Sequence, residues 1–307
     1  MSKRLVLLDH DGAIDDILAT MLLVTMPEIE PLGIIVTPAD CYINAALNVT
    51  RKVLDLMGFS QIPVAESTVR GINPFPALYR RDSLIMDNFP LLNQSAMLKT
   101  PLVPETGQQF MVKTLQTAPK PVTLMVTGPL TTVATALDMA PEIESKIQEI
   151  VWMGGALNVS GNVEKEFAPE HDGTAEWNAY WDAIAVERVW QTKIPLIVCP
   201  LDITNTVPVT SDFIRQLALQ RHYPLSDLAG LCYALAIPQE YYCWDVLATA
   251  YLDCQEIFSV KKCQTAVITN GCSQGRIKVA NEGREILAMT TVDKAAFFRY
   301  LLQQWQR

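Results

Sequence analysis

Short apolar runs alternate with amphipathic segments along most of the chain. Runs rich in Val, Ile and Leu lie at residues 5–8, 32–36, 122–126, 147–153 and 195–199. Each is apolar over most of its length and does not alternate with polar residues, which is typical of strands buried on both faces of a parallel sheet. The segments between them have helical periodicity, most clearly at residues 14–23, 45–56 and 131–137. This order predicts an α/β fold with a mostly parallel, doubly wound (Rossmann-like) sheet.

The pattern changes near the C-terminus. Residues 266–291 alternate between apolar and polar positions, with Asn270-Gly271 and Glu282-Gly283 as turn signals between the segments. Such a pattern predicts antiparallel strands added late to the sheet. No linker rich in Pro, Gly or Ser and no internal repeat divides the chain. Residues 1–307 are therefore predicted to form a single domain.

Composition and charge narrow the function classes. Half of the 307 residues are hydrophobic and only 19% are charged, which excludes intrinsic disorder. The net charge is −9 and no basic run exceeds two residues, so neither a nucleic-acid polymer nor a membrane is an expected partner. The first apolar run ends at Asp9 and no long uncharged stretch follows, so we expect a cytoplasmic protein. The seven cysteines lack metal-site or redox spacing and are expected to be reduced.

An acidic cluster follows the first predicted strand, at the sheet edge where α/β proteins bind ligands. Asp9, Asp11, Asp15 and Asp16 lie within eight residues. Two such charges 4 Å apart repel by about 4 kcal/mol at an effective dielectric constant of 20, and a bound cation would relieve this repulsion. Asp15 and Asp16 also suit the N-terminus of a helix, but that interpretation leaves Asp9 and Asp11 unexplained. The position of Gly12 excludes an EF-hand.

The cluster also resembles the first loop of haloacid-dehalogenase-type phosphatases, in which a strand ends in Asp-x-Asp-Gly. Those enzymes close the loop with a small hydroxyl residue, whereas this chain has Ala13. That interpretation explains neither Asp15 nor Asp16, so the phosphatase is kept as an alternative.

Asp9-x-Asp11-Gly12-x-x-Asp15-Asp16 resembles the N-terminal signature of the inosine-uridine nucleoside hydrolase family, and most closely that of its purine-specific (inosine-adenosine-guanosine) branch. Further blocks resemble that branch in the same order: Thr37-Pro38-Ala39-Asp40-Cys41, Asn73-Pro74-Phe75-Pro76, Val126-Thr127-Gly128-Pro129-Leu130, Met153-Gly154-Gly155-Ala156, Asp172-Gly173-Thr174-Ala175-Glu176-Trp177-Asn178, Asn205-Thr206-Val207-Pro208 and Tyr241-Tyr242-Cys243-Trp244-Asp245. The resemblance covers residue 5 to about residue 250.

The resemblance implies a Ca²⁺ cofactor bound by oxygen ligands, which are the donors that this cation prefers. The matching metal positions are Asp11, Asp16, Asp245 and the backbone carbonyl of Thr127. The implied ribose-binding residues are Asp15, Asn178 and Asp245 at the diol, with Asn162 and Glu176 at the 5′-hydroxyl. The resemblance also suggests a homodimer.

The implied reaction is hydrolysis of the N-glycosidic bond of purine ribonucleosides to free base and ribose. Asp11 is expected to accept a proton from the attacking water, whose pKa the cation lowers. The carboxylates would stabilise positive charge on the sugar in the transition state. Three alternatives stay open: a broad-specificity or pyrimidine nucleoside hydrolase, the phosphatase, and a non-catalytic nucleoside-binding protein.

Activation of the leaving base is the least secure part of the resemblance. The pyrimidine-accepting branches are associated with an active-site His, but no His precedes Trp244-Asp245 in the matching way. Aromatic rings on both faces of a purine would favour its protonated form instead. Trp244 is predicted for one face and Tyr79 for the other, where we expect Trp in purine-specific relatives; Leu78 replaces an expected acidic residue.

Other residues near the predicted base site have less definite roles. Phe75 and Asp40 are placed there by the resemblance, and Asp40 is expected either to act as an acid or to order water. Cys243 has no nearby His to activate it and is not predicted to be a nucleophile. Residues 239–242 are a candidate lid.

Overall fold

The computed structural model describes residues 3–237 and 240–307. Their strands form one sheet in the order β3-β2-β1-β4-β5-β6-β9-β7-β8. All neighbours from β3 to β9 pair in parallel, whereas β7 pairs antiparallel with both β9 and β8. The strands are β1 (Arg4–His10), β2 (Ile29–Val36), β3 (Val64–Glu66), β4 (Val122–Val126), β5 (Ile147–Met153), β6 (Leu196–Cys199), β7 (Phe258–Val267), β8 (Ile277–Val279) and β9 (Arg284–Val292). The predicted mostly parallel sheet with late antiparallel strands is confirmed.

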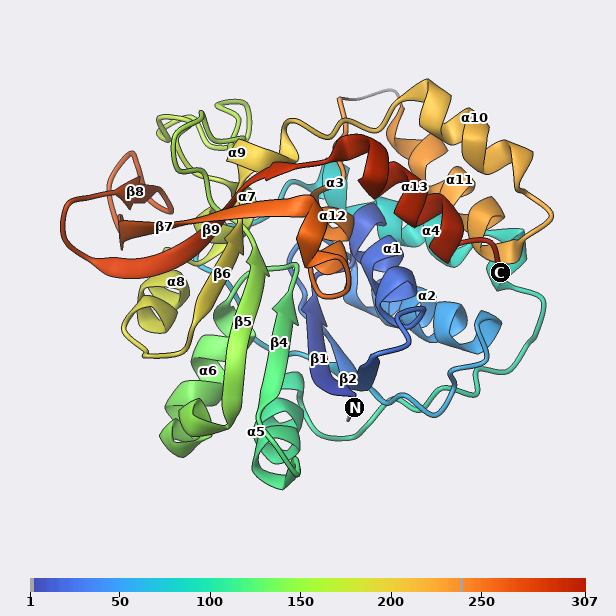
Figure 1. The fold of residues 1–307 in the computed structure, drawn as a ribbon. Coiled ribbons are helices and arrows are strands. Elements are labelled where there is room, and N and C mark those ends of the chain that lie inside the picture. Colours follow the sequence, from blue (N-terminus) through green and yellow to red (C-terminus); the bar gives the residue numbers. More distant parts are fainter. Residues whose placement is uncertain (1–2, 238–239) are drawn as a thin grey trace.

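Helices cover both faces of this sheet (Figure 1), and the side chains of β1 show why its sequence is continuously apolar. Val6 and Leu8 belong to the core on one face, whereas Leu5 and Leu7 belong to the core on the other. The first core is completed by α1 (Ile14–Leu23), α2 (Ile43–Leu56), α10 (Ser211–Leu219), α11 (Pro224–Ala236), α12 (Trp244–Ala250) and α13 (Lys294–Gln304). The second is completed by α5 (Gly107–Thr117), α6 (Thr131–Met139) and α8 (Ala183–Trp190).

Shorter helices lie in the connections. They are α3 (Ala77–Arg80), α4 (Asp82–Asp87), α7 (Trp177–Trp181), α9 (Leu201–Thr204) and the 3₁₀ turns η1 (Pro90–Leu92), η2 (Pro141–Lys146) and η3 (Gln255–Ile257). No described helix is both long and apolar enough to cross a membrane. The seven cysteines are all free and five of them are buried, as expected for reduced thiols.

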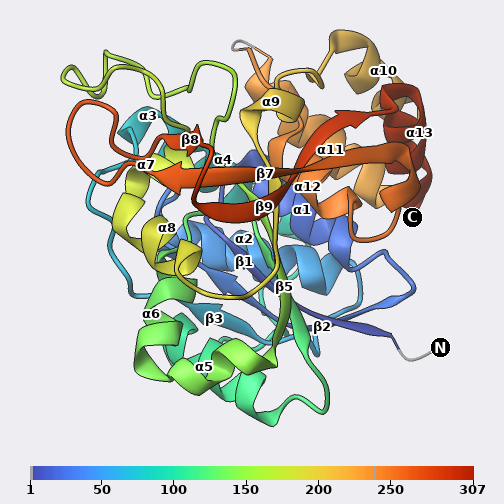
Figure 2. The same ribbon diagram turned by 60° about the vertical axis from the view of Figure 1, so that its left-hand side comes forward.

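The C-terminal strands depart from the predicted pattern in two ways. β7 begins at Phe258, before the predicted start at residue 266, and its early residues are mostly exposed, so they do not form an apolar run. β9 pairs antiparallel with β7 but parallel with β6, which extends the parallel sheet. Figure 2 shows β7 and β9 as a long ribbon, with α13 following β9.

Candidate active site

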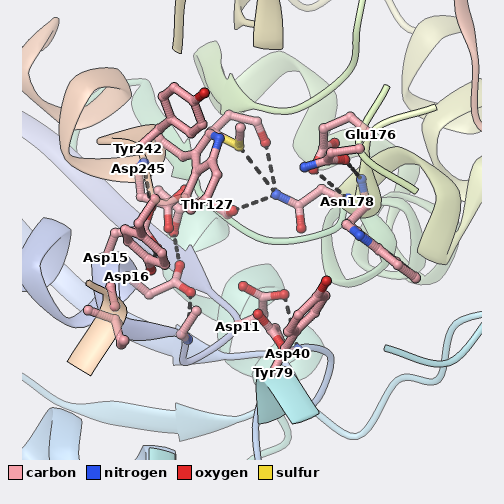
Figure 3. Close-up of a pocket in the computed structure, with 18 of the residues that line it drawn as sticks. Asp11, Asp15, Asp16, Asp40, Tyr79, Thr127, Glu176, Asn178, Tyr242 and Asp245 are labelled. Atoms are coloured by element: carbon pink, nitrogen blue, oxygen red, sulfur yellow. Dashed lines mark hydrogen bonds between the residues drawn. The ribbon is translucent and has the colours of Figure 1, made fainter. Parts of the chain in front are cut away.

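A pocket of about 490 Å³ brings every predicted site residue together. It lies at the carboxyl ends of the central strands, and its wall combines segments from the N-terminal turn, the loops after β2 and β4, and the start of α12 (Figure 3). The predicted residues in this wall are Asp11, Asp15, Asp16, Asp40, Phe75, Tyr79, Thr127, Asn162, Glu176, Asn178, Trp244 and Asp245.

Two glycines allow the turns after β1 and β4 to pack closely. Gly12 has a φ of +86°, and a Cβ atom there would lie 2.6 Å from the Cβ of Ala46. A Cβ atom at Gly128 would lie 2.8 Å from the Cβ of Asp11. Both positions therefore require glycine, because any larger residue would displace the turn that carries Asp11.

Four aspartates in the pocket wall are buried without a basic partner. Asp11, Asp15, Asp16 and Asp245 are each at most 4% exposed. None forms a salt bridge with a Lys or Arg of residues 3–237 or 240–307. Burial, strengthened by repulsion from neighbouring carboxylates, raises the pKa of Asp11 and Asp245 well above the usual range and that of Asp15 to about 6. Such a set of oxygen donors suits a hard cation.

Asp16 and Thr127 are already connected in this site. Asp16 accepts a hydrogen bond from the Thr127 hydroxyl at 2.5 Å and another from the backbone N–H of Ala13 at 2.8 Å. Asp16 is the third residue of α1 and its bond to the N-cap residue Ala13 stabilises the helix start, so the helix-start interpretation of Asp16 is correct as well. The Asn178 amide donates to the Thr127 carbonyl at 2.7 Å. Within the described ranges no three His, Cys, Asp or Glu side chains have the arrangement of a metal site, so the calcium site stays a prediction.

Asp9 does not belong to the pocket wall. Its carboxylate accepts a hydrogen bond from the Thr37 hydroxyl at 2.7 Å, and that hydroxyl lies 2.7 Å from the hydroxyl of Thr132. Burial raises the pKa of Asp9 to about 8. Of the four N-terminal carboxylates, Asp9 is therefore the one outside the pocket wall, where Asp245 from α12 joins Asp11, Asp15 and Asp16.

The residues predicted for the 5′-hydroxyl are held around the start of α7. Glu176 accepts from the backbone N–H groups of Asn178 at 2.8 Å and Gly155 at 2.9 Å. Asn162 accepts from the N–H of Trp177 at 3.1 Å. Burial raises the pKa of Glu176 to about 7. These contacts orient both side chains before any ligand is bound.

The other part of the pocket is lined by aromatic rings. Trp244 packs edge-on against Tyr241, with ring centroids 4.6 Å apart. Separate from them, Trp177 contacts Phe75 at 5.3 Å and Tyr79 at 6.2 Å between centroids. Figure 3 shows Tyr79 beside Asp11 and Asp40, apart from Tyr242 and Asp245. The pocket thus has a carboxylate-rich part and two aromatic walls.

Asp40 lies beside both Asp11 of the carboxylate-rich part and Tyr79 of the aromatic part (Figure 3). Its backbone N–H donates to Asp11 at 3.2 Å, and its Oδ1 atom is buried without a hydrogen-bond partner among the described residues. Leu78, which stands where an acidic residue is expected, is 43% exposed and does not line the pocket. Its side chain therefore adds no apolar contact to the pocket.

Histidine and cysteine are absent from the described part of the pocket wall. His10 and His171 are buried elsewhere, and His222 packs against a neighbouring tyrosine. Cys243 is fully buried and burial raises its pKa to about 12, in keeping with the expectation that it is not a nucleophile.

Three hydrogen bonds in the pocket were not predicted from the sequence. Tyr241 donates a hydrogen bond to Asp15, and Glu164 bonds both Tyr79 and Trp177. No local sequence pattern predicts these hydrogen bonds. Tyr241 and Asp15 are 226 residues apart in the chain, and Glu164 lies in a polar loop.

Part of the candidate lid is anchored by backbone hydrogen bonds. Val209 donates to the Tyr241 carbonyl at 2.9 Å, and Cys243 donates to the Val207 carbonyl at 3.0 Å. Gln239, the first residue of the candidate lid, lies outside the described residues. Tyr241 and Tyr242 are thus attached to the segment after α9.

This fold and pocket are those of a nucleoside hydrolase. The profile of the inosine-uridine preferring nucleoside hydrolase family matches residues 6–299, and the chain belongs to that family.

The solved structures and relatives that the chain resembles are named for different base preferences. It is similar to the inosine-uridine preferring nucleoside hydrolase from Bacillus anthracis, with 40% identity, a TM-score of 0.95 and 99% of each chain covered. The purine-preferring ribonucleoside hydrolase from Gardnerella vaginalis shares the fold at 21% identity, with a TM-score of 0.79 and coverage of 99% and 98%. A pyrimidine-specific ribonucleoside hydrolase from Salmonella arizonae is 34% identical over 73% of this chain and 68% of its own length. A Citrobacter koseri relative of the same description is covered over 63% of its length.

Proposed function

We propose that the protein catalyses the calcium-dependent hydrolysis of purine ribonucleosides to free base and ribose. The observation that carries this proposal is the combination of four buried aspartates with two aromatic walls in one pocket. The carboxylates suit a cation and a ribose diol, and the aromatic walls suit a large planar base.

Asp11, Asp16, Asp245 and the Thr127 carbonyl are the residues that would hold Ca²⁺. When bound, the cation supplies positive charge that offsets the carboxylate repulsion and makes a nearby water more acidic. Asp11 then accepts the proton of the water that attacks C1′. Its raised pKa in the cation-free site reflects burial and like charge, both of which a cation would counteract.

The remaining polar residues bind and orient the sugar. Asp15, Asn178 and Asp245 accept or donate hydrogen bonds at the ribose diol, while Asn162 and Glu176 bind the 5′-hydroxyl. As the N-glycosidic bond breaks, positive charge develops on the sugar and the neighbouring carboxylates stabilise it. The water oxygen bonds to C1′, and the base leaves with the electron pair of the broken bond and gains a proton.

The purine preference rests on the aromatic walls and on the lack of a histidine among the described pocket residues. Stacking against Trp244 and Tyr79 would favour the protonated purine as it leaves. Pyrimidine preference is the second candidate, because the Salmonella relative bears that description.

One assay separates these functions. Hydrolysis of inosine, adenosine, guanosine, uridine, cytidine and a phosphomonoester is measured with Ca²⁺ and after treatment with a chelator. We expect the purine nucleosides to have the higher kcat/KM and the chelator to abolish turnover. Faster hydrolysis of uridine or cytidine would reverse the assigned preference. Turnover of the phosphomonoester alone would support the phosphatase, and binding of inosine without turnover would support a nucleoside-binding protein.

A further inference from the structure

Glu164 connects two aromatic residues of the pocket wall. One carboxylate oxygen accepts a hydrogen bond from the Tyr79 hydroxyl at 2.7 Å, and the other accepts from the indole N–H of Trp177 at 3.0 Å. Glu164 belongs to the loop between β5 and α7, whereas Tyr79 lies in α3 and Trp177 begins α7. All three line the pocket.

We propose that Glu164 is a positioning residue for base recognition, which fixes the ring of Tyr79 against the rigid Trp177. This inference rests on the proposed function, because it assumes that the base lies beside Tyr79. It adds a residue to which the family resemblance assigned no role.

The two partners of Glu164 differ in how firmly they are held. Trp177 is only 6% exposed and its ring also contacts Phe75 and Tyr180. Tyr79 is half-buried, its other ring contact is the 37% exposed Phe167, and its helix α3 has four residues, none of them buried. So short a helix has little stability of its own. The hydrogen bond through Glu164 therefore transfers the rigidity of Trp177 to Tyr79.

The bridge also gives a physical reason for tyrosine at position 79, where tryptophan was expected. The phenol hydroxyl donates directly to Glu164, and the two rings stand nearly perpendicular, at 86°. A ring held in one orientation loses less conformational freedom when a base stacks on it. By that reasoning, removal of the bridge should weaken nucleoside binding by about three- to tenfold.

The test compares Glu164→Ala and Glu164→Gln with a matched control, Glu170→Ala, which changes an exposed glutamate of the same loop. KM and kcat are measured for inosine, together with the inhibition constant of D-ribose, which has no base. The Kd of inosine is also measured in the inactive Asp11→Asn background. Glu164→Ala should raise KM and Kd about three- to tenfold, while the ribose constant and the Glu170→Ala values stay within about twofold of their reference proteins.

Glu164→Gln is the informative variant. Its amide oxygen can accept from Trp177 while its NH₂ group donates to the Tyr79 hydroxyl, so it should recover most of the lost affinity. The inference is overturned if Glu164→Ala binds inosine normally, if Glu164→Gln is as impaired as Glu164→Ala, or if ribose inhibition weakens equally. A wild-type protein that binds inosine without hydrolysing it would overturn the proposed function alone; one that does neither would overturn both.

Discussion

The Tyr241 hydroxyl donates a hydrogen bond to the Asp15 carboxylate at 2.7 Å. The second oxygen of Asp15 accepts from the backbone N–H of Asp245 at 3.1 Å. The N-terminal end of α1 is thereby joined to the N-terminal end of α12, and the orientation of a predicted ribose-binding carboxylate is fixed from both sides. Tyr241 also packs against Trp244, so one residue supports both the sugar and the base parts of the pocket.

Tyr241→Phe should retain the fold but lower kcat/KM for inosine by at least about tenfold. A hydrogen bond to a charged group contributes about 1.5–3 kcal/mol, and its loss leaves Asp15 less well oriented. Tyr242→Phe is the matched control, because its hydroxyl bonds to the exposed Glu240 at 2.7 Å. Steady-state kinetics of both variants checks this. The role given to Tyr241 would be refuted if Tyr241→Phe had a normal kcat/KM while that of Tyr242→Phe was reduced.

Asp11→Asn should reduce kcat by about 10²- to 10⁴-fold, the contribution typical of a general base, with a further loss if Ca²⁺ binds more weakly. The control Asp212→Asn, which changes an exposed residue, should not change turnover. Near-normal activity of Asp11→Asn would remove it as the base.

Asp11→Asn should also affect stability. Because burial raises the pKa of Asp11, the charged carboxylate destabilises the fold when no cation is bound. Asp11→Asn should therefore unfold at an equal or higher temperature without Ca²⁺.

The carboxyl cluster also predicts how stability depends on pH and calcium. Asp15 has a pKa of about 6 in the folded protein, compared with 3.8 for an aspartate outside a folded structure. The pKa values of Asp11 and Asp245 are raised as well. The cation-free native state therefore binds more protons than the unfolded state. Its stability should fall as pH rises from about 4 through 6 and beyond.

Added Ca²⁺ should oppose this loss, since it favours the ionised carboxylates. Melting temperatures are measured between pH 5 and 8, with Ca²⁺ and with a chelator, and the difference between the two values is plotted against pH. Groups that titrate outside the site affect both values alike, so their contribution largely cancels in the difference. We expect the stabilisation by Ca²⁺ to grow with pH; a gap that is zero at every pH would argue against a cation site here.

The sequence predicted the parallel core of the fold well. β4 and β5 have the predicted bounds, because strands buried on both faces are apolar over most of their length. β3 was missed, since three residues are too few to form a recognisable run. β7 was placed too late because its exposed first residues, including Lys261 and Lys262, have no buried face to make a pattern.

The same division holds for the pocket. Residues directly after parallel strands, such as Asp11 and Thr127, could be predicted because the topology carries the ends of those strands to one edge. Glu164 and Tyr241 could not, since their positions depend on loops whose conformation is set by distant contacts. Asp9 lies outside the pocket wall because the alternation of β1 places its side chain on the same face as Leu7, toward Thr37.

Trp244 provides the test of leaving-group activation. Its indole lines the pocket and rests on Tyr241 and Tyr242, with ring centroids 4.6 and 5.6 Å away. If stacking promotes protonation of the departing purine, Trp244→Ala should depress inosine hydrolysis strongly. Hydrolysis of p-nitrophenyl riboside, whose leaving group needs no proton, should be much less affected. Only the transition state of inosine hydrolysis is stabilised by the stacked ring.

Trp244→Phe controls for the loss of volume, since it keeps a ring with weaker cation–π attraction. It should give an intermediate inosine rate and an almost normal rate with p-nitrophenyl riboside. If Trp244→Ala instead slows both substrates by the same factor, Trp244 acts through packing that shapes the pocket. Protonation of the base would then fall to another group, with Asp40 the first to examine because its buried Oδ1 atom has no partner among the described residues.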